Sequence, residues 1–322
     1  MSQIMSFLDR DEIKELNVET RASADGSFIQ LPNGVTHYEL SNPENNSPLP
    51  LGEGVGRRGE PVEAVRDVVF VHGFSVPYFI FDPTFKFLTE SGFRVLRYDH
   101  FGRGLSDRPR ARYNLDLFVD QLSDLLDALR LASTGLNAGA RPVSLIALSM
   151  GGPIASAFTL RHPERVDKLV LIDPVGARPI ALSPALKAAK IPFVAEAILG
   201  LIGGEALIKN AAKDFFDPAW VAHFISQYRV QMQYKGFKRA ILSTLRNNML
   251  DSFIHVYEAL GKTDKPVLLF WGRQDTTVPF EHSDDLRAAL PKVQFHAIDN
   301  CGHIPHYEKP DEVNPILLEF LA

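Results

Sequence analysis

The sequence predicts an α/β protein in which helices cover both faces of a mostly parallel central sheet. From residue 67 onward, short apolar runs alternate with longer segments of helical periodicity, as expected of βαβ units with right-handed crossovers. Most of these runs are continuously apolar, which is typical of strands buried on both faces of a parallel sheet. The length of 322 residues suits one large domain, or a core domain that carries an insertion.

The strands and helices can be assigned in chain order. Two expected strands, at 27–32 and 35–40, flank Asn33-Gly34, which is a strong signal for a two-residue hairpin turn. The parallel strands are expected at 67–71, 94–98, 143–148, 166–172, 266–271 and 293–298. The helices that cover them are expected at 79–91, 115–131, 152–162, 252–261, 281–290 and 311–321.

One stretch of the chain breaks the alternation. Between Asp173 and Lys265 the pattern is helical, at 183–202, 204–215, 218–234 and 237–249. We therefore expect a helical cap, inserted after the strand that ends at Asp173 and laid over the edge of the sheet. The expected organisation is an N-terminal extension at 1–26, a core at 27–174 and 252–322, a cap at 175–251, and a Pro- and Gly-rich surface loop or insertion at 41–65.

The composition excludes several classes of protein. Hydrophobic residues make up 45% and charged residues 23% of the chain, as in ordinary globular domains and unlike disordered or collagen-like chains. The 34 Lys and Arg residues are outnumbered by 39 Asp and Glu residues, whereas a protein that binds nucleic acid favours a basic face. Cys301 is the only cysteine, so no intramolecular disulfide can form.

No signal peptide and no transmembrane segment are expected. Acidic residues occur early in the amino-terminal sequence, and no apolar stretch there suits a signal peptide. The most apolar window, 191–208, is interrupted by Glu196, Glu205 and glycines, whereas a spanning helix needs about 20 mostly apolar residues. We therefore expect a soluble, cytoplasmic protein.

Ser149 is the first candidate for chemistry, because ligands of open α/β sheets bind at the carboxyl ends of the strands. It follows the expected strand 143–148 and precedes Gly151, Gly152 and a helix. Small neighbours allow a strained strand-to-helix turn that projects the serine hydroxyl, and the Met150 N–H at the start of the helix faces the same centre. The alternative interpretation is that Ser149 is only the N-cap of the helix.

The turn after the strand at 67–71 is the second candidate. Gly73 permits a sharp turn that leaves the Phe74 N–H free to point at an oxyanion. The alternative is an ordinary strand-end turn, and for His72 itself we expect a buried, hydrogen-bonded histidine.

An acid and a base follow the last two expected strands. Asp275 could reach a histidine on the neighbouring loop, with Asp173 as its main rival and a structural helix cap as the other alternative. His303 follows the final strand, and His306 is its competitor, because His282 and His296 fall within a helix and a strand. A metal site at His303 and His306 is a weak interpretation, since no cluster of Cys, His and carboxylates supports it.

These groups occur in the order Ser149, Asp275, His303, each after a different strand, which is the order expected of α/β-hydrolases. The chain resembles this superfamily over about residues 27–322. The motifs that carry the resemblance are VHGF (71–74), RYDHFGRGLSD (97–107), ALSMGG (147–152), LLFWGRQDTTVP (268–279) and NCGHIPHYEKP (300–310). The segment that contains Asp99 resembles the structural turn of the family, so no catalytic role is assigned to Asp99.

The spacing resembles capped members of the superfamily: monoacylglycerol-lipase-like esterases, carbon–carbon bond hydrolases and cofactor-free perhydrolases. Ala147 departs from the family pattern, because it replaces the first glycine of G-x-S-x-G, but alanine is still small enough to pack there. Epoxide hydrolases and haloalkane dehalogenases carry aspartate at the position of Ser149, which argues against those two chemistries.

The resemblance implies a serine hydrolase with a Ser-His-Asp triad. His303 would take the proton of Ser149, Asp275 would orient His303, and the backbone N–H groups of Phe74 and Met150 would hold the oxyanion. This mechanism needs no metal and no organic cofactor.

The expected substrate is a small molecule, a carboxylic ester with an apolar acyl or alcohol part. The expected cap is rich in apolar residues, most of which are expected to pack its own helices onto the sheet: Phe193, Ile198, Leu199, Leu201, Ile202, Phe215, Phe216, Trp220 and Phe224. One alternative is a carbon–carbon bond hydrolase of the dienoate or β-diketone type, which would need a polar or cationic group in the pocket to hold a carboxylate. Another is a ligand receptor on the same fold with slow hydrolysis.

Overall fold

The computed structural model of the chain describes residues 11–41, 66–132, 141–181, 204–205 and 207–322. Several expectations lie outside these residues: the first ten positions of the N-terminal extension, almost all of the loop at 41–65, and the helix at 183–202. None of the described helices is long and apolar enough to cross a membrane.

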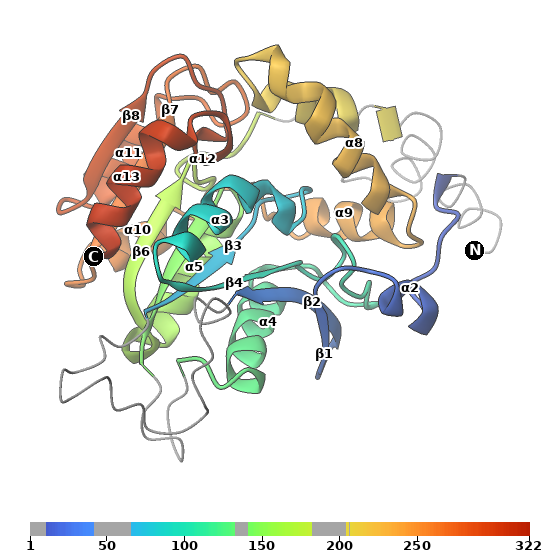
Figure 1. Cartoon of the computed structure of the whole chain (residues 1–322). Helices are drawn as coiled ribbons and strands as arrows, with labels where there is room; N and C mark the ends of the chain where they lie inside the picture. Colours follow the sequence, from blue (N-terminus) through green and yellow to red (C-terminus); the bar gives the residue numbers. More distant parts are fainter. Residues whose placement is uncertain (1–10, 42–65, 133–140, 182–203, 206) are drawn as a thin grey trace.

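The predicted fold class is confirmed, because helices surround a single sheet of eight strands that are mostly parallel (Figure 1). The order across the sheet is β1-β2-β4-β3-β5-β6-β7-β8. The strands are β1 (Ser27–Leu31), β2 (Gly34–Ser41), β3 (Asp67–Val71), β4 (Arg94–Tyr98), β5 (Val143–Leu148), β6 (Val166–Ile172), β7 (Val267–Gly272) and β8 (Gln294–Ile298). Strands β1 and β2 are antiparallel to each other, β2 is antiparallel to β4, and the strands from β3 to β8 are parallel.

The amino-terminal hairpin forms as predicted, but its turn is shifted by one residue. Leu31 pairs with Gly34, so the two turn residues are Pro32 and Asn33 rather than Asn33 and Gly34. Gly34 has a φ of 147°, and a Cβ at that position would lie 2.9 Å from the Cβ of Asp107. The glycine is therefore required as the first residue of β2, where the chain passes close to another segment.

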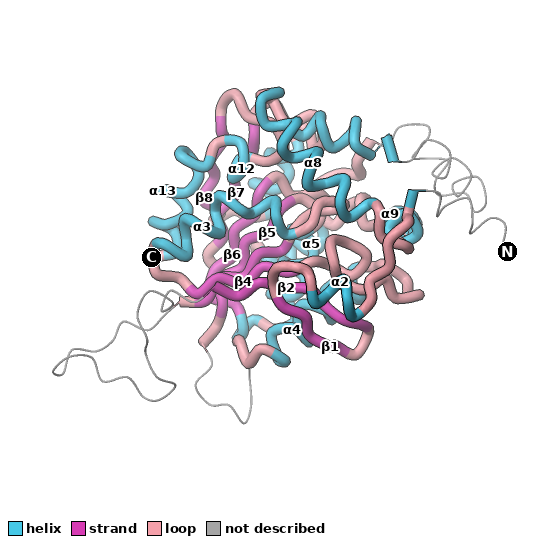
Figure 2. Tube along the Cα trace, turned by 45° about the vertical axis from the view of Figure 1, so that its right-hand side comes forward, coloured by secondary structure: helices cyan, strands magenta, loops and turns pink. Residues whose placement is uncertain are grey.

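The helices divide between the two faces of the sheet, and Figure 2 shows α4 and α8 on opposite sides of the molecule. The helices are α2 (Val18–Ala22), α3 (Asp82–Glu90), α4 (Leu115–Ala128), α5 (Gly151–Arg161), α8 (Val221–Met232), α9 (Phe237–Arg246), α10 (Ile254–Leu260), α11 (His282–Ala289), α12 (Pro305–Glu308) and α13 (Pro310–Leu321). Short 3₁₀ turns lie before α3 and within the stretch between β6 and α8.

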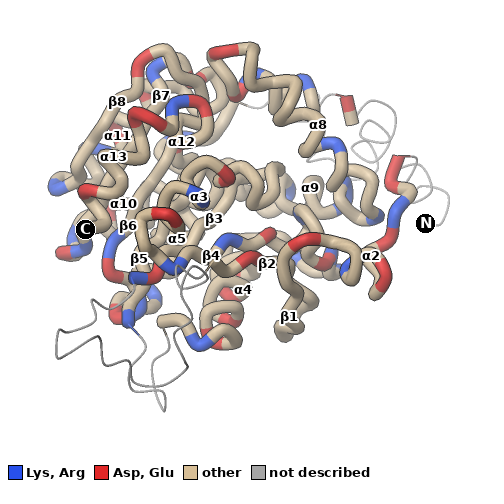
Figure 3. Tube along the Cα trace, in the orientation of Figure 1, with Lys and Arg blue, Asp and Glu red and all other residues tan. Residues whose placement is uncertain are grey.

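Two apolar cores form, one on each face, because successive strand residues point to opposite sides. In β3, Val69 and Val71 belong to the core beneath α4, α5, α10 and α11, whereas Val68 and Phe70 belong to the core beneath α3 and α13. Burial on both faces explains why this strand is an uninterrupted apolar run after Asp67. Figure 3 shows that the middle of the sheet is largely uncharged, while acidic and basic residues are interspersed along helices and loops.

The order of the strands reverses beside β3. The chain passes from β3 to its neighbour β4, and the next strand, β5, lies on the other side of β3. Connections that leave in opposite directions open a crevice at the carboxyl ends of the two strands, which is where open α/β sheets bind ligands. The segments that enter this crevice are the turn at 72–74 and the turn that holds Ser149.

The stretch between β6 and β7 is helical in its described part and contains α8 and α9, but no strand. Helix α10 returns to the core, where Val256, Tyr257 and Leu260 pack beneath the sheet. The division of the chain into core and cap remains a proposal, because residues 182–203 are not described.

The segment from residue 11 to 15 lies against the start of α9. The buried carboxylate of Glu12 accepts hydrogen bonds of 2.6 Å from the backbone N–H groups of Gly236 and Lys238. The Lys14 N–H donates to the carbonyl of Gln233 at 2.8 Å, and the Lys14 carbonyl accepts from the Lys235 N–H at 2.9 Å. A carboxylate thus satisfies N–H groups at a helix amino terminus, where negative charge is favourable.

Candidate active site

Ser149 occupies a strained turn between β5 and α5. Its φ is 53°, in the left-handed region that a residue with a Cβ rarely adopts. The turn is held by hydrogen bonds from the Ser149 N–H to the Ile172 carbonyl at 2.9 Å and from the Gly152 N–H to the Ser149 carbonyl at 2.9 Å. The N-cap of α5 is Met150, and no side chain caps the helix, so the interpretation of Ser149 as an N-cap is wrong.

Glycines allow this turn because neighbouring backbones approach it closely. A Cβ on Gly151 would lie 2.1 Å from the Val71 carbonyl oxygen, and one on Gly152 would lie 2.5 Å from the Cβ of Pro174. Gly73 faces the serine directly, since its own Cβ would lie 3.2 Å from the Cβ of Ser149. The expectation that small residues are needed around the serine is therefore supported at these positions.

His303 and Asp275 meet at the carboxyl ends of β7 and β8. The His303 Nδ1 lies 2.7 Å from the Asp275 Oδ2, and both side chains are buried. The other carboxylate oxygen of Asp275 accepts from the backbone N–H groups of Thr277 at 2.7 Å and Val278 at 2.9 Å. Because a carboxylate can only accept, Nδ1 of a neutral His303 carries the proton, and its Nε2 is left as an acceptor.

The charges around His303 determine its basicity. Burial lowers the pKa of His303, but the negative charge and hydrogen bond of Asp275, and then the charge of Asp214, outweigh burial and raise this pKa above its ordinary value. The competing His306 is fully buried beside Phe81, and burial lowers its pKa to about 3. His303 is therefore the histidine with a carboxylate partner and the higher pKa.

A cavity of about 70 Å³ brings Ser149 and His303 together, although the two residues are far apart in sequence. Its apolar lining consists of the aromatic residue Phe74 and the aliphatic residues Val76, Ile80, Leu148, Leu207, Ala211 and Ile304. Its polar lining consists of Ser75, Ser149, Asn210, Asp214, Thr277 and His303. No Lys or Arg is found among the described residues that line the cavity.

The two backbone groups expected to hold an oxyanion lie next to the serine. Phe74 follows the glycine that faces Ser149, and Met150 is the residue directly after Ser149. Neither backbone N–H donates a hydrogen bond to another residue within the part of the chain that the structure describes. Both donors are therefore free for a ligand oxygen. His72, by contrast, is a buried residue whose Nε2 accepts from the His100 N–H at 2.8 Å, as expected.

Asp173, the alternative candidate for the acid, lies next to the Asp275–His303 pair. Asp173, Asp275 and His303 each offer one side-chain atom that could bind a metal, and these three atoms all lie within 4.8 Å of one another. Burial and the charge of Asp275 raise the pKa of Asp173 well above its ordinary value. Since His303 Nδ1 and Asp275 Oδ2 are hydrogen-bonded to each other, we interpret the cluster as a proton-sharing site rather than a metal site.

One residue near the histidine, Asp214, was missed in the sequence. Asp214 lies in the helical stretch before α8, where its carbonyl accepts from the His303 N–H at 2.7 Å. Its carboxylate accepts from the Thr277 hydroxyl at 2.5 Å. No motif points to Asp214, because it reaches the site only through the packing of the stretch between β6 and β7 onto the ends of β7 and β8.

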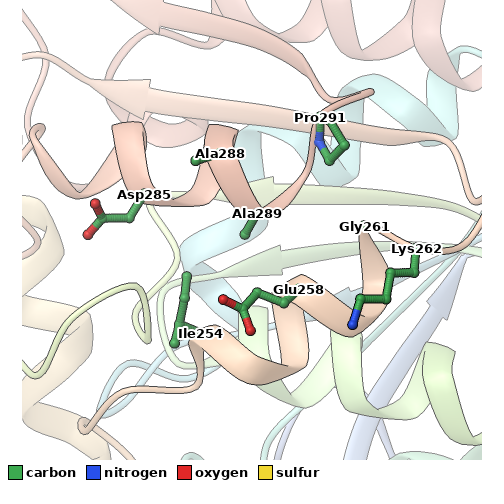
Figure 4. A pocket seen from close by; sticks show the side chains of 8 residues that line it. All are labelled: Ile254, Glu258, Gly261, Lys262, Asp285, Ala288, Ala289 and Pro291. Carbon is green, nitrogen blue, oxygen red and sulfur yellow. The ribbon is translucent and has the colours of Figure 1, made fainter.

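None of the apolar cap residues singled out in the sequence lines the cavity, as far as their positions are described. Phe215 and Phe224 are buried in the core on the α3 side, Trp220 packs against it, and Phe216 is 49% exposed. The remaining expected residues fall within 182–203 and are not described. A larger hollow, of about 520 Å³, lies between α10 and α11 and is lined by Glu258, Lys262 and Asp285 among others (Figure 4). It contains none of the candidate residues.

The fold and this site define a hydrolase of the α/β class, and comparison with known families agrees. The chain belongs to the alpha/beta hydrolase family, whose model matches residues 68–316.

The matches to the named relatives cover about three quarters of the length of each relative. A 2-hydroxymuconate semialdehyde hydrolase of Pseudomonas sp. strain CF600 is 28% identical over 235 residues, which are 71% of this chain and 76% of that protein. A 2-hydroxy-6-oxononadienedioate/2-hydroxy-6-oxononatrienedioate hydrolase of Klebsiella pneumoniae is 30% identical over 253 residues, 73% of this chain and 78% of that protein. A meta-cleavage product hydrolase structure from Pseudomonas fluorescens IP01 has a TM-score of 0.69 at 23% identity, covering 92% of this chain and 97% of that one, which shows the shared fold.

Proposed function

We propose that the protein hydrolyses a substrate at a carbonyl carbon, with Ser149 as nucleophile, His303 as general base and acid, and Asp275 as the partner that orients His303. The observation that carries this proposal is the position of Ser149 in a strained turn, in the same cavity as a histidine whose other ring nitrogen is bonded to a buried carboxylate. This is the arrangement of nucleophile, base and orienting acid that activates serine.

The reaction follows from these groups. Ser149 Oγ attacks the carbonyl carbon while His303 Nε2 takes its proton, and the N–H groups of Phe74 and Met150 stabilise the oxyanion. Collapse of the tetrahedral intermediate expels the leaving group, which takes the proton from His303, and leaves an acyl group on Ser149. Water, deprotonated by His303, then attacks the acyl group, and the serine recovers its proton.

The substrate that the cavity favours is a carboxylic ester with an apolar acyl part. Six aliphatic side chains and Phe74 form the apolar part of its wall, and its small volume suits a short acyl group. Apolar walls also exclude water from the charge that develops on the oxyanion, which strengthens its hydrogen bonds to the backbone.

Carbon–carbon bond hydrolysis is the second candidate, because two of the relatives are named for it. Their names describe a muconate semialdehyde and dienedioate or trienedioate substrates, all of which carry carboxylate groups. The same serine, histidine and backbone donors could act on a ketone carbonyl in such a substrate.

Active-site labelling with a fluorophosphonate, followed by mapping of the modified peptide, tests the proposal. We expect the label on Ser149, and we expect Ser149→Ala to lower turnover of 4-nitrophenyl butyrate by about 10⁴-fold or more. Ser156→Ala is the matched control, since this buried serine on α5 lies outside the cavity. Normal turnover by Ser149→Ala would contradict the proposal.

Parallel assays with 2-hydroxy-6-oxo-6-phenylhexa-2,4-dienoate separate the two candidate reactions. A kcat/KM for the dienoate far above that for short neutral esters would favour the carbon–carbon hydrolase. The opposite ranking would favour the esterase. Repeated turnover of either substrate would exclude a receptor that reacts only once.

A further inference from the structure

Asp214 places a third carboxyl group at the candidate active site, one that the proposed mechanism does not use. It lines the same cavity as Ser149 and His303. Unlike Asp275, which bonds to the histidine ring, its carboxylate accepts a hydrogen bond from the Thr277 hydroxyl at 2.5 Å and remains partly exposed.

The position of Asp214 is fixed from three sides. Its carbonyl accepts the His303 N–H at 2.7 Å, and Thr277 holds the carboxylate. A Cβ on Gly302 would lie 2.3 Å from the Asp214 carbonyl oxygen, so the two backbones are in close contact. Because Thr277 also donates its N–H to Asp275, the carboxylate cannot move far without disturbing the histidine pair.

The negative charge of Asp214 is not cancelled by a cation in the cavity. The described lining residues include no Lys or Arg, and His303 must be neutral to act as a base. Burial raises the pKa of Asp214 to about 6, against the opposing effects of His303 and the Thr277 hydroxyl, so the group is still largely ionised at pH 7.

We propose that Asp214 is a specificity-determining residue that makes this a site for neutral acyl groups, because its carboxylate repels substrates with an anionic group near the scissile carbonyl. This inference rests on the proposed function and names the substrate class of the same site. Like charges within a partly buried cavity repel strongly, since the effective dielectric constant there is far below that of water. The dienedioate class of substrate would be disfavoured for the same reason.

Two esters of matched shape and different charge test this inference. One is 4-nitrophenyl 3-sulfopropanoate, whose sulfonate stays anionic at every pH used, and the other is 4-nitrophenyl 4,4-dimethylpentanoate, whose tert-butyl group has the same shape without charge. We expect the wild-type kcat/KM to favour the neutral ester by roughly 10- to 100-fold. Asp214→Asn keeps an acceptor for Thr277. In this variant we expect the ratio of the two kcat/KM values to fall toward unity, because kcat/KM for the sulfonate ester rises.

Asp217→Asn is the matched control, because Asp217 carries the same charge three residues away but caps a 3₁₀ turn outside the cavity. It should leave the ratio unchanged. A merely structural role of Asp214 would lower kcat/KM for both esters equally.

The pH dependence gives a second readout. The titratable groups that face Asp214 are His303, Asp275, Asp173 and Tyr228. Protonation of His303 slows the hydrolysis of both esters alike, so it cancels in the ratio of their kcat/KM values. The wild-type preference for the neutral ester should therefore decline as the pH falls from 8 to 5 and Asp214 becomes neutral. In Asp214→Asn the ratio should not change with pH.

The outcomes are distinct. If wild type hydrolyses the neutral ester but Asp214→Asn leaves the ratio as it was, the inference is overturned while the proposed function stands. If wild type hydrolyses neither ester and takes no fluorophosphonate, the proposed function is wrong, and the inference falls with it.

Discussion

His303 is hydrogen-bonded to the carboxylate of Asp275, and its protonation state should control the activity. A neutral imidazole is required to accept the serine proton, and Asp275 raises the pKa of His303 above the ordinary value of 6.5 in spite of burial. The active form is therefore lost as the pH falls through this raised pKa.

The first prediction concerns the acidic limb of the pH profile. For a neutral ester, kcat/KM of the wild type should fall with decreasing pH, with a midpoint above 6.5. Asp275→Asn removes the negative charge that favours imidazolium, so the midpoint should move to lower pH, while the maximal rate drops by about 10³- to 10⁴-fold because the histidine loses its orienting acceptor. Steady-state kinetics between pH 5 and 9 measure both effects.

Asp173→Asn provides the control for this prediction. Burial and the charge of Asp275 favour the protonated form of Asp173 by raising its pKa, and asparagine keeps an acceptor for the Gly272 N–H, which lies 2.9 Å from Oδ1. Asparagine also tolerates the left-handed backbone at this position, where φ is 41°. We expect the midpoint to stay near its wild-type value and the rate to change by less than about tenfold. A loss as large as that of Asp275→Asn would identify Asp173 as the partner acid instead.

At the scale of the elements, the strands were the most predictable feature. The runs at 67–71, 94–98, 143–148 and 166–172 coincide with β3, β4, β5 and β6. Strands buried on both faces are uninterrupted apolar runs, so their ends are visible where polar residues or glycines begin. The hairpin turn lies one residue earlier than expected, and Gly34 is instead the first residue of β2, where a Cβ would lie 2.9 Å from the Cβ of Asp107.

The candidate site was predictable only where it follows a strand. Ser149 directly follows β5, and Asp275 and His303 lie in the loops after β7 and β8, so that strand order and motif point to them together. Asp214 could not be found in this way, because its place depends on how the stretch before α8 packs against the 302–303 backbone. Long-range packing of this kind leaves no periodic signal in the sequence.

The second prediction concerns the strand-to-helix turn. Gly151→Ala would place a methyl group 2.1 Å from the Val71 carbonyl oxygen, in a strand that is buried throughout its length. Neither backbone can yield without breaking sheet hydrogen bonds, so we expect the free energy of unfolding to fall by about 2 kcal/mol or more, with loss of activity. Urea denaturation measures the change.

Gly204→Ala is the comparison for this variant. The nearest atom to its new Cβ is 3.6 Å away, which is ordinary contact. We expect a change within about 0.5 kcal/mol. Equal stabilities of the two variants would show that the approach of Val71 does not constrain position 151.

At the scale of the whole molecule, the amino-terminal segment joins the sheet domain to the helices between β6 and β7. Strands β1 and β2 belong to the sheet, while Glu12 and Lys14 bond to the residues just before and at the start of α9. Helix α9 in turn contacts the segment after β4 through the Arg239 guanidinium, which donates to the Arg108 carbonyl at 2.5 Å. The amino-terminal segment therefore supports the start of α9.

The third prediction tests that support. Glu12→Ala leaves the buried N–H groups of Gly236 and Lys238 without their acceptor, so we expect the free energy of unfolding to fall by about 2 kcal/mol. Glu19→Ala, on the exposed helix α2, should change it by less than about 0.5 kcal/mol. Hydrogen exchange should show the loss of protection concentrated in α9. Protection that falls evenly over the whole sheet would contradict a local role.

The bond between Glu12 and Gly236 spans 224 positions of sequence, which has a consequence for the newly made chain. Ribosomes add about 5–20 residues per second, so Glu12 is synthesised roughly 10 to 45 s before the Gly236 amide that it will bind. The segment that holds Glu12 therefore cannot pack against the start of α9 until strands β1 to β6 have been synthesised.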